Sequence, residues 1–420
     1  MAAHPRVFLL VSAVLACALS ISHLPSLVLD AQFYADDGGW YQAAYSQGPL
    51  RSLAHPAAGY FVMFQRLVAS AASPLPTVAV PTVFNVVAIV VGAVGICYLL
   101  SSRMSVAIPS LWANLTNTQW RLGLVALLVV FARPARAIRG WLLDAALFAT
   151  AGLTGPASLL LEPIVAWLWF RERTRRHRYL LILNTLCAAI QLAAIVVRAG
   201  TQRSSSALAA GPFPLLQMVA RQVTLGLAVG AHGISHLVST HAVTSVAILA
   251  VLAFIPLAVC GWAAWRGPRI LRALCFLALF ELSLALVAPQ VPAPRWQSLA
   301  RPANITEFHP GGIRYFLYPL LAFATSLGWI AVRGGRNWLA LRRFGRRARP
   351  RDWGERAAGL GAAGVLVVAL IVGVPADWRY PPYIDEHWSA NVQKVEAARP
   401  GTVVVIPINP RGWELTLTAR

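Results

Sequence analysis

The chain has 420 residues, of which 58% are hydrophobic and 12% are charged, and its formal net charge at pH 7 is +21. This composition and a mean hydropathy of +0.62 exclude an ordinary soluble enzyme. Several apolar runs can cross a bilayer core of about 30 Å, which takes roughly 20 helical residues. We therefore expect an all-α polytopic membrane protein whose main partner is the lipid bilayer.

The positive charge is almost entirely arginine, because Lys394 is the single lysine of the sequence. The arginines cluster between apolar runs, where the positive-inside rule places cytoplasmic loops. This distribution argues against nucleic acid as a partner. The five cysteines all lie within apolar runs and have no paired spacing, so they predict neither a disulfide framework nor a metal site.

The first half of the chain alternates apolar runs with polar loops. A first transmembrane helix is predicted from about Val7 to Leu29, with a kink or exit near His23 and Pro25. The outer loop 30–76 follows and contains an amphipathic helix that starts near Tyr60. Further apolar segments, several of them barely long enough to span, are predicted at Val80–Leu100, Met104–Leu115, Trp120–Ala132, Trp141–Gly152 and Ala157–Phe170.

The second half continues the same alternation. We interpret residues 198–241 as an outer loop with a re-entrant or interfacial helix, and residues 289–312 as another outer loop. Crossings are predicted at Tyr179–Val197, Val243–Trp265, Ile270–Ala288, Ile313–Val332 and Ala358–Val374. The total is about eleven transmembrane helices, within a range of about nine to thirteen because the short segments are ambiguous.

The chain is predicted to divide into a multispanning domain, residues 1–374, and a polar tail, residues 375–420. The tail should hold a helix at Glu386–Ala398 and a strand at Thr402–Ile406. Four arginine clusters agree on one orientation, with a cytoplasmic N-terminus and an extracytoplasmic tail. This orientation gathers the unusual polar sequences on the outer side.

The adjacent carboxylates Asp36 and Asp37 are the main candidates for chemistry. They follow the first apolar segment on what reads as a short turn of glycines and aromatic residues. One carboxylate can act as a general base while the other orients substrate or shares a divalent cation. Like charges also push one pKa of such a pair upward, toward the useful range. The alternative is a solvated polar loop without chemistry.

Several short sequence motifs resemble those of a known class of membrane enzyme. A first helix followed by an acidic pair in an outer loop resembles integral-membrane glycosyltransferases of the GT-C fold. The resemblance extends to blocks found in a group of bacterial multispanning proteins: FYADDGGWYQAAY, HPAAGYF, NLTNTQW, LTGP, IRYF and IPINPRGWEL.

The resemblance implies an enzyme of the bacterial cytoplasmic (inner) membrane that transfers a sugar, with inversion, from a polyprenyl-phosphate donor. The acceptor would be an envelope glycan, lipid or protein outside the cytoplasm. Asp36 or Asp37 would be the general base. We favour Asp37, because Gly38 and Gly39 directly after it permit close approach of a substrate.

Residues on the predicted outer side could bind the substrates. Arg314 can bind the donor phosphate bidentately, although it could instead extend from the end of its helix to lipid headgroups. Arg51 and Arg66 are weaker candidates for the same role, since either could be an ordinary interfacial arginine. Amide, hydroxyl, imidazole and aromatic groups that suit sugar hydroxyls are Asn114, Asn117, Gln119, Trp120, Thr154, Tyr60, His55, His309 and Tyr315. For Asn114, Asn117, Gln119 and Trp120, capping and packing at the tip of a helical hairpin is the alternative role. No metal site is predicted beyond a cation that Asp36 and Asp37 could share.

Two other functions stay open. A transporter or flippase for lipid-linked envelope intermediates would need a polar path through the bilayer. Asp144, Glu162 and Glu281 lie within apolar segments, where a carboxylate is expensive and either couples transport or pairs with a neighbouring helix. The third interpretation is a non-catalytic envelope assembly protein with a degenerate site.

Overall fold

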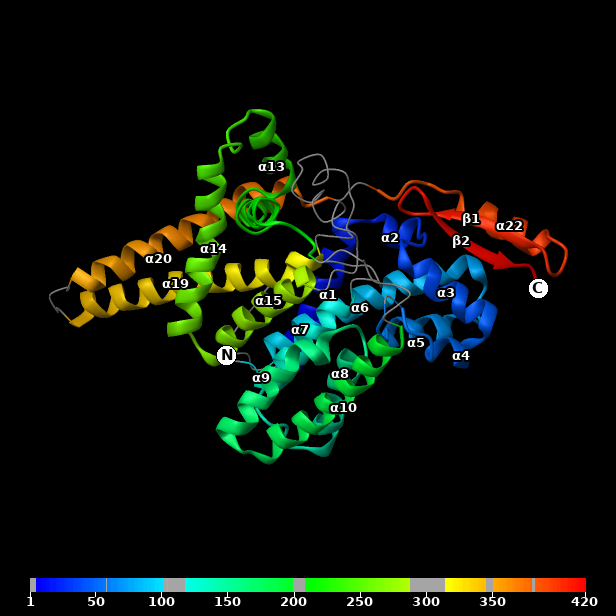
Figure 1. Ribbon diagram of the computed structural model, residues 1–420, viewed down its shortest axis with the longest axis horizontal. Helices are drawn as coiled ribbons and strands as arrows, with labels where there is room; N and C mark the ends of the chain where they lie inside the picture. The colour runs from blue at the N-terminus through cyan, green and yellow to red at the C-terminus, as the bar shows by residue number, and fades with distance from the viewer. Residues whose placement is uncertain are drawn as a thin grey trace. The chain divides into compact units, whose positions relative to one another are not determined.

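The computed structural model describes residues 5–57, 59–101, 104, 118–198, 208–287, 314–344, 350–379 and 382–420. The chain packs into two compact units, coloured along the chain in Figure 1. The first unit combines Met1–Gln202 with Arg379–Arg420, and the second is Arg203–Trp378. The predicted tail therefore packs together with the N-terminal residues.

The membrane helices of the first unit follow the apolar runs closely. They are α1 (Pro5–His23), α6 (Val80–Leu100), α7 (Thr118–Phe131), α8 (Ile138–Gly152), α9 (Ala157–Glu172) and α10 (Arg175–Arg198). The first apolar run is interrupted, because α1 ends at His23 and the short α2 (Ser26–Leu29) begins after Pro25. Proline lacks an N–H and disfavours helical conformation in the residue before it, so the helix is interrupted where a kink or exit is predicted, and the exit from the membrane stays a prediction.

Between α1 and α6 the chain forms short helices. These are α2, α3 (Asp36–Gln47), α4 (Pro49–Leu53), α5 (Met63–Ala72) and the 3-10 turn η1 (Thr77–Ala79). The prediction of a turn around the acidic pair is wrong, because Asp36 and Asp37 form the first turn of the twelve-residue helix α3. Negative side chains are favoured at a helix N-terminus, which helps a segment with two consecutive glycines to become helical.

The tail adds a helix and a hairpin to the first unit. They are α22 (Trp388–Ala397), β1 (Val403–Ile408) and β2 (Trp413–Thr418), with antiparallel pairing from Val403↔Thr418 to Ile408↔Trp413. Alternate side chains are buried: Ile406 and Ile408 on one strand, Leu415 and Leu417 on the other. They pack in one core cluster with α3, α5 and α22. The predicted strand is confirmed, whereas the prediction missed its partner β2.

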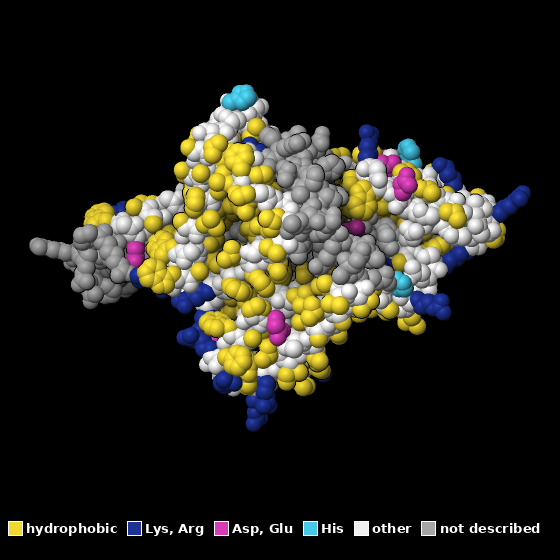
Figure 2. Space-filling view, in the orientation of Figure 1, with side chains coloured by type: hydrophobic (Ala, Val, Ile, Leu, Met, Phe, Trp, Pro, Cys, Tyr) yellow, Lys and Arg dark blue, Asp and Glu magenta, His cyan; other side chains and the backbone are white. Residues whose placement is uncertain are grey.

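We call α2–α5, η1 and residues 382–420 the polar cap. The cap contacts one common end of the membrane helices. The backbone N–H of Met63 donates to the Leu153 carbonyl at 3.1 Å, and that of Phe61 donates to Gln191 Oε1 at 2.8 Å. The ends of α7, α8, α9 and α10 away from the cap carry arginines, including Arg133 and Arg171, and dark-blue side chains gather where α9 meets α10 in Figure 2.

The second unit is also helical. Its elements are α11 (Pro212–Met218), the π-helical η2 (Val219–Leu225), α12 (Gly226–Ala228), α13 (Gly230–Ser239), α14 (Val246–Arg266), α15 (Arg269–Val287), η3 (Arg314–Phe316), α19 (Leu317–Phe344), α20 (Pro350–Val368), η4 (Ala369–Gly373, also π-helical) and α21 (Val374–Ala376). The antiparallel pair α19 and α20 touches backbone to backbone, because a Cβ on Gly334 would lie 2.9 Å from the Cα of Gly359.

Six helices among the described residues are long and apolar enough to cross a membrane: Arg6–His23, Thr77–Leu100, Arg175–Val197, Val246–Arg266, Arg269–Val287 and Trp353–Ala376. Large apolar side chains cover their exposed flanks, as the yellow surface of Figure 2 shows; examples are Leu10, Val196 and Leu370. Such surfaces suit lipid and not water. The chain is therefore a helical membrane protein, and the larger predicted number of crossings stays a prediction.

Candidate functional site

The acidic pair lies at the start of α3, inside the polar cap. Asp37 is 1% exposed, whereas Asp36 is half-buried. The backbone N–H of Asp37 donates to the Tyr34 carbonyl at 3.1 Å. Between them Ala35 has φ 50°, a left-handed conformation that non-glycine residues seldom adopt and that recurs at functional sites. The backbone is therefore strained directly before α3, the helix whose first turn contains the buried Asp37.

Two buried tyrosines lie near Asp37, one from each end of the chain. The rings of Tyr34 and Tyr383 stack with their centroids 5.5 Å apart. Burial, and secondly the charge of Asp37, raise the pKa of Tyr34 well above its usual range. The same two causes, followed by Tyr34 itself, raise the pKa of Tyr383. Both phenols therefore keep their protons at neutral pH and stay available as hydrogen-bond donors.

The glycines after the acidic pair differ in their surroundings. A Cβ on Gly38 would lie 2.6 Å from Ile408 Cδ1, so this glycine lets the hairpin pack directly on α3. A Cβ on Gly39 would meet nothing within 4 Å. At Gly38 the space is therefore taken by Ile408 of the hairpin. At Gly39 it is open, so close approach of a substrate there stays a prediction.

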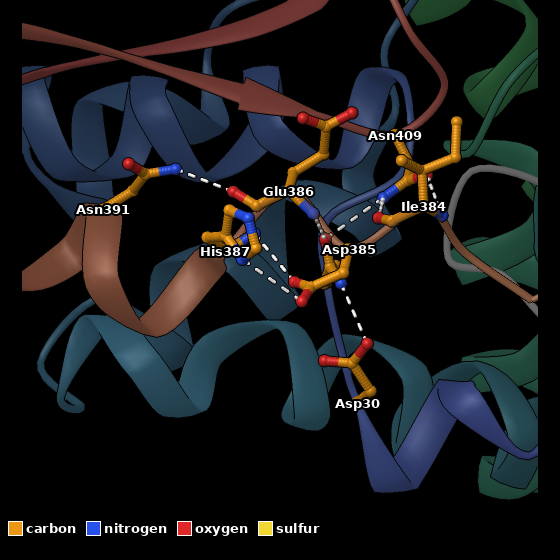
Figure 3. A network of polar contacts seen from close by, with 8 residues as sticks. Asp30, Ile384, Asp385, Glu386, His387, Asn391 and Asn409 are labelled. Atoms are coloured by element: carbon orange, nitrogen blue, oxygen red, sulfur yellow. Dashed lines mark hydrogen bonds and ion pairs between the residues drawn. The ribbon is translucent and has the colours of Figure 1, made fainter.

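A hydrogen-bond network fixes the tail against the first loop of the cap (Figure 3). Asn409 Nδ2 donates to Gln32 Oε1 at 3.2 Å and to the Ile384 carbonyl at 2.9 Å. Asn409 Oδ1 accepts from the Ile384 N–H at 2.9 Å. Gln32 in turn accepts from the Glu386 N–H at 3.0 Å and donates to Asp30 at 3.1 Å. This network holds the segment that carries Tyr383.

Arg66 on α5 and Trp40 on α3 form a second polar feature of the cap. The guanidinium Cζ lies 5.0 Å from the centre of the Trp40 ring. Both residues are buried, and burial lowers the pKa of Arg66. Trp40 follows Asp37 by three residues, so the two lie on one face of α3, about one turn apart.

Three of the predicted substrate contacts are buried where the cap meets the membrane helices. Thr154 is fully buried, and its hydroxyl accepts from the Phe64 N–H at 3.1 Å and donates to the Thr150 carbonyl at 2.6 Å. Gln119 and Trp120 lie in the first turn of α7, each 5% exposed. These bonds join Thr154 to α5 and to its own helix end, and its part in substrate binding stays a prediction.

The other predicted contacts are spread more widely. Tyr60 belongs to the apolar cluster of the cap, together with Trp40. His55 is exposed, and its Nδ1 lies 3.2 Å from the Arg51 carbonyl. Arg314 and Tyr315 belong to η3 of the second unit, where Tyr315 is buried. Asn114, Asn117 and His309 lie outside the described residues.

A divalent cation shared by Asp36 and Asp37 would need further ligands. Within the described ranges, no group of three or more His, Cys, Asp or Glu side chains is placed to hold a metal ion. The two aspartates alone make an incomplete ligand set for magnesium or manganese, which prefer six oxygen ligands. The shared cation stays a prediction, and no chemical step is assigned to it below.

The acids within the apolar helices have different surroundings. Asp144 Oδ2 lies 3.6 Å from Arg176 Nη2, and its other oxygen accepts from the Tyr98 hydroxyl at 3.2 Å. Glu162 accepts hydrogen bonds from Asn184 and Thr185 of the neighbouring helix. These contacts are the structural pairing that the sequence offered as an alternative. Glu281 on α15 differs, because neither carboxylate oxygen has a hydrogen-bond partner in the described structure.

Comparison with known proteins identifies no relative. No protein-family model matches the chain, and neither a curated protein nor a solved structure matches it. The functional argument therefore depends on the residues of this chain.

Sequence reasoning singled out the acidic pair but missed the residues that surround it. Tyr34 lies only three positions before Asp37, yet an aromatic residue before an acidic pair is not a signal by itself. Tyr383 and Asn409 lie about 350 residues away in the sequence. Asn409 belongs to IPINPRGWEL, one of the blocks that resemble bacterial multispanning proteins. That block was the signal in the sequence that could have pointed to Asn409.

Proposed function

We propose that this protein is a membrane glycosyltransferase that moves a sugar from a polyprenyl-phosphate donor to an acceptor outside the cytoplasm. The observation that carries the proposal is Asp37, a buried carboxylate at a helix N-terminus that is covered by protein from both ends of the chain. Carboxylates are seldom fully buried, and functional sites are one place where they are. The cap that holds Asp37 contacts the ends of membrane helices such as α8 and α10, where a lipid-linked donor would arrive.

The proposed reaction is a single displacement. The acceptor hydroxyl oxygen forms a bond to the anomeric carbon of the sugar while the bond between that carbon and the phosphate oxygen breaks. The lipid phosphate leaves with the electron pair, and the hydroxyl proton passes to Asp37. Protonated phenols of Tyr34 and Tyr383 lie close enough to sense the charge of Asp37 and can orient polar groups beside it.

The orientation is part of the proposal. In the first unit, arginines lie at the ends of α7, α8, α9 and α10 that point away from the polar cap. The positive-inside rule places such ends in the cytoplasm. The cap, with Asp37 and the tail, then faces the outer side of a bacterial cytoplasmic membrane, with the N-terminus inside. We retain about eleven crossings and a GT-C-like arrangement, in which shorter helices such as α7 also span.

The test is transfer by the purified full chain with a panel of labelled polyprenyl-phosphate sugars. Asp37→Asn should lower transfer at least ~100-fold, the usual minimum for losing a general base. Asp36→Asn should have a smaller effect, because that carboxylate is half-buried. Asp385→Asn is the matched control, since Asp385 is an exposed carboxylate of the same cap. Equal transfer by wild type and Asp37→Asn would reject Asp37 as the base.

One observation favours a second function. Glu281 is 3% exposed within an apolar helix, and its oxygens lack hydrogen-bond partners among the described residues. Intramembrane carboxylates of this kind mark proton and substrate pathways in transporters. If no donor in the panel supports transfer, export of a lipid-linked intermediate from proteoliposomes becomes the assay. Glu281→Gln should then abolish coupling to a proton gradient, with Glu162→Gln as the hydrogen-bonded control.

A further inference from the structure

Arg66 and Trp40 form a buried pair for which the described residues supply no counter-charge. Arg66 is 6% exposed and Trp40 is 9% exposed. The guanidinium lies against the indole at 5.0 Å, a favourable contact that leaves the N–H groups of both side chains unused. The pair connects α5 to α3, the helix that begins with the acidic residues.

The unused polar atoms of this pair are all hydrogen-bond donors. Arg66 Nε and Nη1 and Trp40 Nε1 are buried and have no hydrogen-bond partner among the described residues. Burial also lowers the pKa of Arg66, as expected when a cation leaves water without meeting an anion. Buried charges are costly unless they are paired, and buried N–H groups seldom stay unmatched.

Two other buried or half-buried arginines of the described structure are satisfied by protein, whereas Arg221 Nε in the second unit is also buried without a partner among the described residues. Arg176 is buried beside Asp144 and also donates to the Val129 and Val130 carbonyls. Arg333 pairs with Glu355 at 3.3 Å. The fold can therefore supply acceptors to its arginines. Because Arg66 Nε and Nη1 have no acceptor among the described residues, we look for their partner in a ligand.

The ligand must supply acceptors and negative charge. Guanidinium groups bind phosphate and carboxylate with strong, directional hydrogen bonds, and the indole N–H adds a neutral donor beside them. The cap lies at the ends of the membrane helices, where phosphate groups of membrane lipids are abundant. This position favours phosphate over carboxylate. Asp37, one turn of α3 away, would repel the anion, so the anion is expected on the Arg66 side of Trp40.

We propose that Arg66 and Trp40 form a binding site for a phosphate group. Its assignment to the sugar donor rests on the proposed function, in which the leaving lipid phosphate would be bound about one helical turn from the base. Anion binding itself requires no sugar transfer. The same chemistry could recognise a free phosphate or one attached to a lipid.

Two probes separate these sources: inorganic phosphate and dodecyl phosphate, each titrated into the full chain in neutral detergent. Trp fluorescence and thermal unfolding report binding. Both probes should raise the Tm of wild type if free phosphate suffices, and only dodecyl phosphate should do so if the lipid chain is needed. Arg66→Met should weaken binding roughly ten- to a hundredfold, as expected for losing charge-assisted hydrogen bonds. Arg66→Lys should retain part of the affinity, and Trp40→Phe should weaken it several-fold.

Arg51→Met is the matched control, because Arg51 is an exposed arginine of the same cap and its loss changes the net charge equally. Without ligand, Arg66→Met should have a Tm equal to or above that of wild type, since it removes an unpaired buried charge. A Tm well below wild type would show that Arg66 is a structural cation and would overturn the proposal. Unchanged binding by Arg66→Met, or no binding of either probe by wild type, would also overturn it.

The site and the enzymatic function can fail separately. Asp37→Asn should bind dodecyl phosphate at least as tightly as wild type, because it removes a repelling charge. A chain that binds phosphate through Arg66 but transfers no sugar would reject the glycosyltransferase proposal and keep the site. Transfer that depends on Asp37 but not on Arg66 would keep the enzyme and reject the site as part of it.

Discussion

Asn409 and Gln32 are 377 positions apart in the sequence, and their side-chain amides are hydrogen-bonded at 3.2 Å inside the polar cap. Asn409 is 2% exposed and also pairs with both backbone groups of Ile384. Through this residue the C-terminal hairpin, the segment that carries Tyr383 and the loop before Asp37 become one structure. The surroundings of the proposed base therefore depend on the last part of the chain.

Asn409→Ala should lower stability by about 2–4 kcal/mol, because several buried backbone and side-chain groups lose their partner at once. Thermal unfolding in detergent measures the loss, and limited proteolysis should show earlier cleavage between residues 382 and 402. Arg411→Ala is the control, since Arg411 is exposed in the same hairpin. If both variants resist protease like wild type, the network does not hold the tail.

Gly38→Ala should destabilise the cap by about 1–3 kcal/mol, because the new methyl group overlaps the buried end of Ile408. Gly39→Ala is the matched control, because open space surrounds it and alanine favours helix by up to about 1 kcal/mol. Thermal unfolding of both variants should thus give changes of opposite sign. Ile408→Val removes the overlapping methyl group, so the double variant with Gly38→Ala should recover part of the loss. Equal effects of the two alanine variants would contradict the packing described for the hairpin.

Asp144→Asn should cost about 3–5 kcal/mol, because it leaves Arg176 buried without its counter-charge. The double variant Asp144→Leu with Arg176→Met should be more stable than Asp144→Asn, since no isolated charge remains. Melting temperatures measured in detergent show which of the two variants is more stable. Glu162→Gln provides the comparison, because an amide can still accept from Thr185. A mild loss for Asp144→Asn would mean that the ion pair is dispensable and would reopen a functional role for this carboxylate.

Alkaline stability should reflect the two tyrosines beside Asp37. Their pKa values are raised in the folded protein by burial and by Asp37, whereas an unfolded tyrosine ionises near its ordinary value of about 10. The folded state therefore holds the protons longer, and stability falls as the pH rises above about 10. Unfolding between pH 8 and 11.5 should show a shallower decline for Tyr383→Phe than for wild type.

Asp37→Asn removes one of the two causes, so tyrosinate absorbance should begin at a lower pH in this variant. Tyr179→Phe, which deletes an exposed phenol, is the control for loss of one tyrosine. If Tyr383→Phe and wild type decline with the same slope, Tyr383 is not shielded from solvent as described.

Elements with strong local patterns could be predicted from the sequence. Helix α6 has the predicted bounds Val80–Leu100, because its continuous apolar run leaves no ambiguity. The interruption near Pro25 was predictable because proline acts locally. Long-range packing was not predictable: α3 reads as a turn because of Gly38 and Gly39, and its helical form is supported by contacts with α5 and β2.

In the candidate site, too, local features could be predicted from the sequence and long-range contacts could not. Asp36 and Asp37 stand out because charge is scarce in this chain, so the sequence alone could locate them. Arg66 could not be distinguished from other interfacial arginines, because its significance lies in the absence of acceptors around it. The pairing of Asp144 with Arg176 depends on which helices are neighbours, which hydropathy does not reveal.

The position of the hairpin has a consequence for biosynthesis. A ribosome makes α3 within the first fifty residues, whereas Ile408 and Leu415, which pack against Gly38, are synthesised much later. Until then α3, with the acidic pair, is not covered by the hairpin. Premature termination anywhere upstream of the hairpin would thus yield a chain with an incomplete Asp37 environment, which ties the proposed activity to synthesis of the hairpin.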